Sequence, residues 1–210
     1  MTRGRFITLE GGEGAGKSTL LSGLESWLRA QGVEPLRTRE PGGTALGEAL
    51  RALLLDPAQA GLSAESELLL MFAARAELVR KLIVPALAAG RWVLSDRYTD
   101  ASYAYQGGGR GQPVARIRAL EQWAALDLKP DRTLLLDLPV AAARARAAGR
   151  GHPDRIEREN DDFFERVLSV YRARAAAEPQ RFSLLDASAS PDVVLAAAQA
   201  AVQPLLGARA

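Results

Sequence analysis

The sequence contains no cysteine and only one histidine. Without cysteine there can be no disulfide bond, and no zinc or iron–sulfur centre held by thiolates. The absence suits a reducing compartment, and we expect a cytoplasmic protein. The single histidine, His152, lies in the loop 149–155, "GRGHPDR", where we expect it to be exposed to solvent and not catalytic.

Long apolar runs and a strong net charge are also missing. No stretch reaches the roughly 18 apolar residues that a membrane-spanning helix needs, and the glycines that follow Leu9 interrupt any signal-peptide core. Among 210 residues the formal net charge is only +2, which is too small to indicate nucleic acid or a membrane as a partner. We therefore expect neither. The length suits one domain, residues 1–210.

What the sequence does contain is a regular alternation of short apolar runs and helical patterns. The apolar runs predict strands at 6–10, 33–38, 91–96, 132–138 and 181–187. Helical spacing predicts helices between them, among others at 17–30, 44–55, 64–89 and 140–148, whereas the glycine-rich stretch 106–111 predicts a flexible loop. This alternation predicts an α/β fold with a parallel sheet and helices on both faces. Ligands of such sheets bind beyond the carboxyl ends of the strands.

The first predicted strand leads into a stretch that matches the P-loop pattern Gly-x-x-x-x-Gly-Lys-Ser, and a predicted helix follows. Its glycines let backbone N–H groups surround a phosphate, and the helix N-terminus adds a partial positive charge. Lys17 would reach the β- and γ-phosphates of a nucleoside triphosphate, and Ser18 would bind Mg²⁺. The predicted nucleotide-binding residues are Gly11, Gly12, Glu13, Gly14, Ala15, Gly16, Lys17, Ser18 and Thr19.

The P-loop alone does not identify the group that receives the γ-phosphate. Water is the acceptor in a GTPase switch, but this sequence lacks the Asn-Lys-x-Asp motif that reads guanine. A kinase needs a second pocket with its own cations. Polar clusters at strand ends, or on the helix that begins at 64, predict such a pocket: "TREPGG" (38–43), "MFAAR" (71–75), "SDRY" (95–98) and "SYAYQGGGRG" (102–111).

These motifs resemble those of the bacterial thymidylate kinases, in order and over nearly the whole chain. The shared stretches include "TREPGGT" (38–44), "AYQGGGRG" (104–111) and "DRIERENDDFF" (154–164). The first two argue against other nucleotide kinases, and a non-catalytic homologue is disfavoured by the intact Lys17, Ser18, Asp96, Arg97 and lid arginines. The resemblance implies transfer of the γ-phosphate of ATP to dTMP, with Mg²⁺, in dTTP synthesis. It also implies a P-loop NTPase-type fold with a five-stranded parallel sheet, a short mobile lid and a homodimer. The helices at 64–89 and 100–106 could form the dimer interface.

The resemblance also implies residues for the acceptor phosphate and the metal ion. Arg97 should bind the phosphate of dTMP, because a guanidinium pairs with a dianion through two hydrogen bonds, and Arg51 should be a second contact. Asp96 should lie near Mg²⁺, together with Ser18. Glu13, Arg39 and Glu40 match positions that line the acceptor side.

For the base, the resemblance implies a hydrogen bond from Arg75, with Ser102, Tyr105 and Gln106 as further contacts. The stacking residue is open between Met71 and Phe72, because both offsets from Arg75 share roughly one helix face. We favour Phe72, against the alternative that this phenylalanine only packs in the core.

The resemblance further implies a lid at about residues 144–157 that carries the arginines for phosphoryl transfer. The variable positions of the P-loop hold none. Arg146 and Arg150 are four residues apart, can share a helix face and are the predicted catalytic pair, while Arg144 and Arg155 flank them. Beside the adenine, Ala187 and Ser188 could give backbone contacts, although a helix cap would explain Ser188 equally well.

Overall fold

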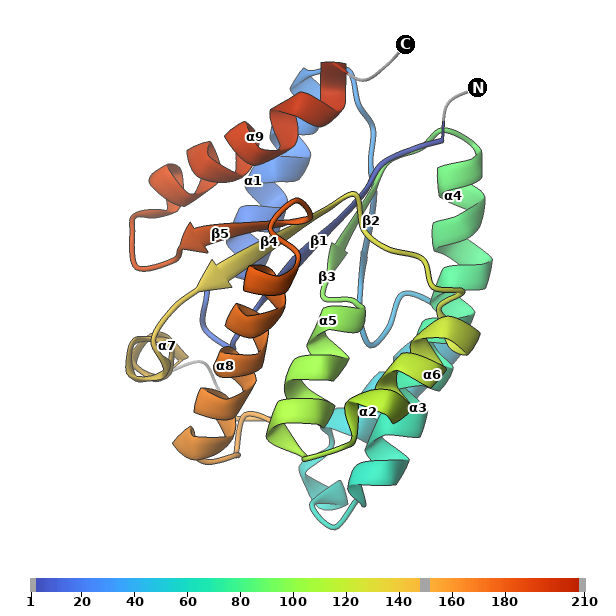
Figure 1. Ribbon diagram of the computed structural model, residues 1–210, viewed down its shortest axis with the longest axis vertical. Coiled ribbons are helices and arrows are strands. Elements are labelled where there is room, and N and C mark those ends of the chain that lie inside the picture. Colours follow the sequence, from blue (N-terminus) through green and yellow to red (C-terminus); the bar gives the residue numbers. More distant parts are fainter. Residues whose placement is uncertain (1–2, 148–151, 208–210) are drawn as a thin grey trace.

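The computed structural model describes residues 3–147 and 152–207. At its centre is a five-stranded parallel sheet with the strand order β2-β3-β1-β4-β5 (Figure 1). The strands are β1 Phe6–Gly11, β2 Leu36–Arg39, β3 Val93–Asp96, β4 Arg132–Asp137 and β5 Phe182–Asp186. The predicted fold class is confirmed, and each predicted strand is present within a few residues of its expected bounds.

Helices cover both faces of this sheet. On one face lie α1 Lys17–Ala30 and α9 Pro191–Gly207 (Figure 1). The other helical segments are α2 Ala45–Leu55, η1 Pro57–Gln59, α3 Ala64–Leu78, η2 Val79–Ile83, α4 Val84–Ala88, α5 Thr99–Ser102, η3 Tyr103–Gly109, α6 Val114–Ala124, α7 Val140–Ala147 and α8 Asp161–Ala177.

The alternation of side chains along β1 decides what each face of the sheet carries. Ile7 and Leu9 point into the core beneath α1 and α9. Phe6 belongs to a core cluster on the other face, which includes residues of α3, η2 and α4. Glu10 also points to that second face, where its carboxyl group accepts a hydrogen bond from the Tyr171 hydroxyl of α8 at 2.7 Å. A strand that reads as apolar therefore delivers one carboxyl group to the interior.

The helix predicted at 64–89 is interrupted. Residues Val79–Ile83 form a π-helical turn between α3 and α4. Pro85 stands in the first turn of α4 and has no N–H to donate to the preceding turn, so the regular helical hydrogen bonding changes just before it.

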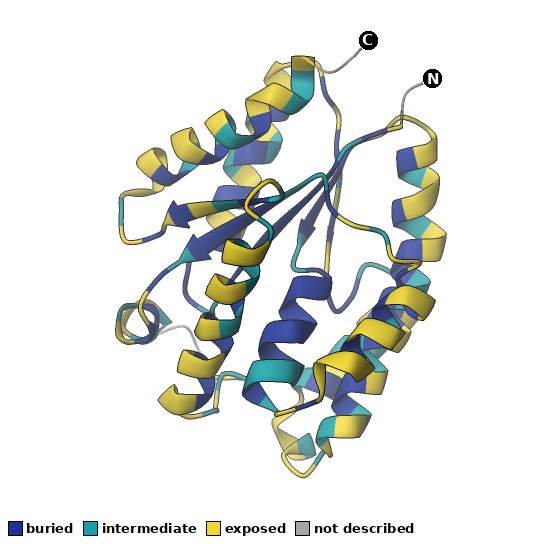
Figure 2. Cartoon of the chain, viewed as in Figure 1, coloured by how far each residue is buried: buried dark blue, intermediate teal, exposed yellow. Residues whose placement is uncertain are grey.

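The stretch 106–111 differs from its prediction as a flexible loop. It is helical as far as Gly109, and η3 is largely buried (Figure 2). The glycines are there for close packing: a Cβ on Gly109 would lie 2.4 Å from the ring of Phe163, and one on Gly108 would lie 2.9 Å from the carbonyl oxygen of Arg166. Small residues let η3 approach α8 closely, and this fixes the wall of the cleft described below.

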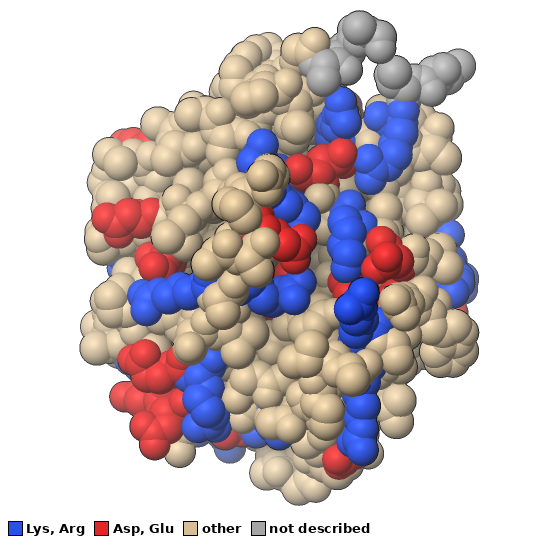
Figure 3. All heavy atoms as spheres, viewed as in Figure 1, with Lys and Arg blue, Asp and Glu red and all other residues tan. Residues whose placement is uncertain are grey.

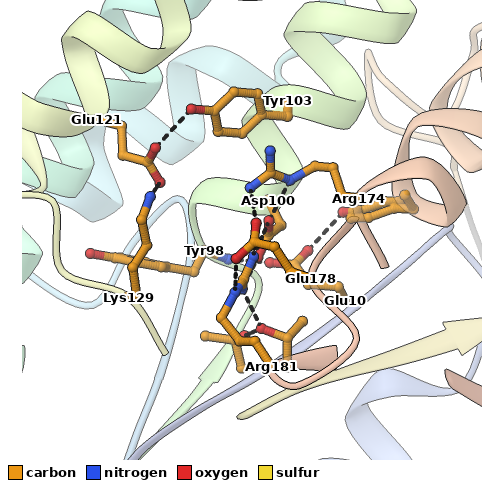
Figure 4. Close-up of polar contacts among 12 residues, drawn as sticks. Glu10, Tyr98, Asp100, Tyr103, Glu121, Lys129, Arg174, Glu178 and Arg181 are labelled. Atoms are coloured by element: carbon orange, nitrogen blue, oxygen red, sulfur yellow. Dashed lines mark hydrogen bonds and ion pairs between the residues drawn. The ribbon is translucent and has the colours of Figure 1, made fainter. Parts of the chain in front are cut away.

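A buried ionic cluster joins the same two segments (Figure 4). Asp100 of α5 is fully buried and accepts hydrogen bonds from Arg174 at 2.5 Å and from Arg181 at 2.6 Å. Arg174 also lies over the ring of Tyr103, 3.8 Å from its centre. The cluster ties α5 and η3 to the C-terminal part of α8. Helix α5 begins shortly after the end of β3, so the cluster lies close to the site.

Candidate active site

The P-loop connects β1 to α1, as the sequence predicts, and it packs directly against α7. Gly14 has a φ of 76°, and a Cβ there would lie 2.4 Å from the carbonyl oxygen of Ala143, so glycine is required both for the turn and for the contact. Gly16 is the N-cap of α1, with a left-handed backbone. The loop geometry therefore depends on α7, the helix that begins the predicted lid.

Lys17 begins α1 and is buried, and its ammonium group stays within the loop. The Nζ atom donates to the carbonyl oxygens of Gly11 at 3.1 Å and Gly12 at 2.8 Å. Burial lowers the pKa of Lys17, and the charge of Arg97 adds to this effect. Ser18 and Thr19 follow on the exposed side of the first helical turn.

One cavity of about 420 Å³ connects the P-loop with the predicted acceptor residues. On the P-loop side it is lined by Glu13, Gly14, Gly16, Lys17, Ser18 and Thr19. On the other side it is lined by Arg39, Glu40, Arg51, Met71, Asp96, Arg97, Tyr105 and Gln106. The structure thus brings members of both predicted sets to one cleft at the carboxyl ends of the strands.

Arg97 is the cation at the centre of this cleft. Its backbone is left-handed, with a φ of 70°, a conformation that costs a non-glycine residue about 1–3 kcal/mol and that concentrates at functional sites. Its guanidinium donates to the carbonyl oxygen of Gly11 at 2.9 Å and to the Tyr105 hydroxyl at 2.9 Å, and it forms an ion pair with Glu13. The side chain is therefore held at the junction of P-loop and acceptor pocket by groups of the protein itself.

Glu13 is kept ionised by these neighbours. Desolvation alone would raise the pKa of its carboxyl group, but Arg97 and Lys17 outweigh this and lower the pKa to about 2. The Tyr105 hydroxyl lies 3.4 Å from the same carboxylate. An acid within the P-loop thus belongs to the charge balance of the acceptor side.

Two oxygen-bearing side chains meet the requirements of a magnesium ion. Asp96 ends β3, and its Oδ1 atom is buried without a hydrogen-bond partner among residues 3–147 and 152–207. Ser18 lines the same cavity. Mg²⁺ prefers oxygen ligands and usually keeps several waters while it binds phosphates, so one carboxylate and one hydroxyl beside the P-loop fit this ion.

The residues predicted to read the base divide into two groups. Met71, Tyr105 and Gln106 line the cavity, whereas Phe72, Arg75 and Ser102 lie beneath its surface. Arg75 is buried, and it donates to Glu40 at 2.7 Å, to Ser102 at 2.9 Å and to the backbone oxygen of Tyr98 at 3.0 Å.

Phe72 packs in the core with Leu68 and Tyr103, and the Arg75 guanidinium lies 4.4 Å from its ring centre. The preference for Phe72 over Met71 as the residue facing the base is therefore not what the geometry favours. Helix α3 turns Phe72 toward α6 and η3, and the position one residue earlier faces the cleft.

The other acceptor-side residues lie around the turn after β2. Arg51 of α2 donates to the carbonyl oxygen of Pro41 at 3.0 Å, and Arg39 pairs with Glu48 at 2.7 Å in an exposed position. Glu40 is buried beside Arg75, and burial raises the pKa of its carboxyl group. These side chains form the rim of the cleft opposite the P-loop.

The lid arginines that the structure describes have partners of their own. Arg144 pairs with Asp161 at 2.9 Å, and Arg155 is buried against Glu67 at 2.7 Å. Arg146 donates to the carbonyl oxygen of Ala187 at 2.7 Å and lies near that of Ser188, so it contacts the turn predicted to lie beside the adenine. Arg150 lies outside the described residues, and His152 is exposed, as expected.

Sequence reasoning missed the buried groups behind the site. Glu10 accepts hydrogen bonds from the Tyr98 backbone N–H at 2.8 Å and from Tyr171, whose hydroxyl also lies 3.3 Å from Arg97. Burial raises the pKa of Glu10 to about 8, and the charge of Asp100 adds to this. A carboxyl residue inside an apolar strand is the one signal that could have identified Glu10. Tyr171 gave none.

Comparison with known proteins adds a family to this geometry. The family model described as thymidylate kinase matches residues 9–198. A thymidylate kinase of Alkalilimnicola ehrlichii is 55% identical over 96% of this chain and 94% of its own. One of Pseudomonas syringae pv. tomato is 57% identical over 97% of this chain and 95% of its own.

A solved structure leads to the same family. The crystal structure of a thymidylate kinase from Ehrlichia chaffeensis matches with a TM-score of 0.77 and 31% identity, over 96% of this chain and 99% of that one. Both the cleft and these similarities lead to one assignment: the chain belongs to the thymidylate kinase family.

Proposed function

We propose that the protein transfers the γ-phosphate of ATP to the phosphate of dTMP, giving dTDP and ADP, as a step in dTTP synthesis. The observation that carries the proposal is the single cavity in which Lys17 and Ser18 of the P-loop face Arg97, Tyr105 and Gln106. Phosphoryl transfer depends mainly on positioning and on neutralising charge. A shared cavity with cations on both sides supplies both.

On the donor side, the P-loop would hold the ATP phosphates with its backbone N–H groups, and Lys17 would neutralise the transferring group. Ser18 and Asp96 would hold Mg²⁺, which neutralises phosphate charge when it is bound. Arg146 and Arg150 would act on the phosphates from the lid. Arg146 would move there from its contacts with the carbonyl oxygens of Ala187 and Ser188.

On the acceptor side, Arg97 would bind the dTMP phosphate, supported by Arg51 and Arg39 at the rim. Because the Arg97 side chain is already held in place by its hydrogen bonds, it loses little conformational freedom when the phosphate binds. Glu13 would give up part of its pairing with Arg97 to the incoming phosphate and would remain near the sugar. No general base is needed, because the acceptor phosphate is already an anion near neutral pH.

For the base, Met71 would cover one face of thymine, and Tyr105 and Gln106 would complete the pocket. Arg75 and Ser102 bond each other behind this wall. They would contact the base directly only after a side-chain rearrangement. Without that rearrangement, they would support the side chains that form the wall.

We also propose a cytoplasmic homodimer. Exposed apolar side chains lie on neighbouring helices, with Leu69 on α3 and Val114 and Trp123 on α6, and Trp123 is 75% exposed. They support an interface that includes α3. The other expected element, 100–106, is buried within the chain and lies between α6 and α8 (Figure 2), so it lends no support to an interface.

The viewed face of the molecule carries basic side chains interspersed with acidic ones (Figure 3). Such a mixture gives no support to a nucleic-acid partner. Of the described part of the chain, no helix is long and apolar enough to cross a bilayer.

The test is a coupled assay of ADP release with ATP·Mg²⁺ and, in turn, dTMP, dUMP, AMP, GMP and CMP. The proposal predicts turnover with dTMP far above that with the purine and cytosine monophosphates. Activity confined to another monophosphate, or only slow hydrolysis without an acceptor, would contradict it. Sedimentation at assay concentration tests the dimer separately.

A further inference from the structure

Glu67 of α3 lies where three segments far apart in the sequence meet. It is 1% exposed. Its Oε1 atom accepts a hydrogen bond from the Gln106 amide nitrogen at 2.9 Å. Its Oε2 atom accepts from Arg110 at 3.1 Å and from Arg155 at 2.7 Å. The carboxylate therefore joins α3, the cavity wall and the segment 153–159. The proposed reaction assigns it no role.

The first consequence concerns the orientation of the Gln106 side chain. A carboxylate held between two guanidinium groups can only accept hydrogen bonds, so the NH₂ group of Gln106 must face Glu67. The amide oxygen is then turned away from Glu67. Among residues 3–147 and 152–207 this oxygen has no hydrogen-bond partner, although it is buried. Gln106, which lines the substrate cavity, thus has one hydrogen-bond acceptor that no group in the described part of the chain uses.

An acceptor fixed in this way distinguishes pyrimidines by their ring nitrogen. Thymine carries a hydrogen on N3 and can donate to it. Cytosine has a lone pair on N3, so it would place an acceptor against an acceptor and leave both buried groups unpaired. A site built to receive one hydrogen bond discriminates strongly against a ligand that cannot make it. If the amide of Gln106 could turn over, this discrimination would be lost.

The second consequence concerns the segment 153–159, which includes the C-terminal end of the predicted lid. Besides its bond to Glu67, the Arg155 side chain donates to the carbonyl oxygen of Leu54 at 2.8 Å. Its backbone N–H donates to that of Leu55 at 3.0 Å. Arg110 reaches the same segment through Glu159, at 2.5 Å. The cavity wall and this segment therefore share one carboxylate.

We infer that Glu67 is a specificity-determining positioning residue: its carboxylate fixes the Gln106 amide with the oxygen toward the base, and ties that orientation to the lid segment through Arg155. The inference rests on the proposed dTMP kinase activity and deepens it. Glu67 itself need not touch the substrate. Its effect is the choice between an N3–H donor and an N3 acceptor on the pyrimidine.

The test compares dTMP with 5-methyl-dCMP, which has the same sugar, phosphate and methyl group but the cytosine pattern at N3 and C4. The kcat/KM of each is measured for the wild type, for Glu67→Gln and for the control Glu65→Gln. Glu65 lies on the same helix, is exposed and bonds Gln112. We expect the ratio of the two kcat/KM values to fall at least tenfold in Glu67→Gln, because an amide at 67 accepts either orientation of Gln106. The control should keep the wild-type ratio.

A role in stability alone would reduce both kcat/KM values equally and leave the ratio unchanged, and that result would overturn the inference. Gln106→Leu supplies a second readout. Adding Glu67→Gln to it should not lower the ratio further if Glu67 acts through Gln106, whereas an additional tenfold loss would contradict this route.

If Glu67→Gln does not fold, Glu67→Asp keeps the charge for the two arginines but withdraws the carboxylate from Gln106, and the same fall in ratio is expected. A wild type that does not turn over dTMP would contradict the proposed function. If the wild type turns over dTMP and the ratio of the two kcat/KM values is unchanged in the variants, only this inference is contradicted.

Discussion

The donor half of the cleft is one continuous stretch of chain, residues 11–19, while the acceptor half takes its side chains from β2, α2, α3, β3 and η3. The donor half uses glycines and a helix N-terminus, so its geometry follows from the backbone. The acceptor half depends on side chains that hold one another, such as Arg97 with Tyr105, and Arg97 also pairs with Glu13 of the P-loop.

This difference has a consequence for mutations. A backbone-built half should have few single residues whose loss is decisive, because most of its groups are main-chain amides. A half built from side chains should respond to many substitutions, each through a different partner. The predictions below test that contrast, from the largest expected effect to the smallest.

Lys17→Ala removes the one side-chain cation within the P-loop. We expect kcat for ADP release to fall by about 10³-fold, near the upper end of what one charge-stabilising group supplies. Lys81→Ala is the control, because Lys81 is 67% exposed and pairs with Glu77 on the same helical stretch. A Lys17 variant with near-normal kcat would show that the donor half does not rely on this residue.

Arg97→Ala removes the central cation of the acceptor half. We expect kcat/KM for dTMP to fall by about 10²-fold, because charge-assisted hydrogen bonds to the phosphate and to the P-loop are lost together. KM for ATP should change little. Arg91→Ala changes a residue just before the N-terminal end of β3, away from the cleft, and should leave both constants as they are. Unchanged constants for dTMP in Arg97→Ala would refute its role.

Met71→Ala and Phe72→Ala separate the cavity surface from the core beneath it. We expect Met71→Ala to raise KM for dTMP by about tenfold, since an apolar contact with the base is lost. Phe72→Ala should instead lower the free energy of unfolding by about 3–5 kcal/mol. Glu65→Ala, on the exposed side of α3, should do neither. A larger KM effect from Phe72→Ala, at unchanged stability, would make Phe72 the stacking residue after all.

Glu10 should make stability depend on pH. Its pKa is raised from 4.5 to about 8 in the folded protein, so the fold favours its protonated form. The free energy of unfolding should therefore fall as pH rises from about 4.5 to about 8, where the unfolded chain loses the proton first. Glu10→Gln, which stays neutral, should flatten this fall in urea titrations at pH 5.5 and pH 8. An equal slope in both proteins would contradict it, and Glu34→Gln, which is exposed, serves as the control.

The same contrast explains what the sequence could predict. The P-loop is local, so its residues, its strand and its helix follow from spacing alone. Arg97 could be placed because it directly follows a strand. The choice between Met71 and Phe72 could not be made, because both lie on nearly the same side of α3 and only the packing of α6 and η3 decides which is covered.

Three further differences have similar causes. The glycines of 106–111 suggest flexibility in the sequence, but they serve close packing against Phe163. Arg155 reads as one of several lid arginines, and only the fold shows that Glu67 buries it. Glu10 and Tyr171 meet only in the folded chain, across a large separation in sequence.

The most direct test of the two-part cleft is calorimetric titration of dTMP, without ATP, into the wild type, Lys17→Ala and Arg97→Ala. Because the acceptor half is held by its own side chains, Lys17→Ala should bind dTMP with a Kd within about threefold of the wild type although it no longer turns over. Arg97→Ala should lose about 10²-fold in affinity. Equal losses in the two variants would contradict the account, since dTMP binding would then depend on the P-loop lysine as much as on the acceptor arginine.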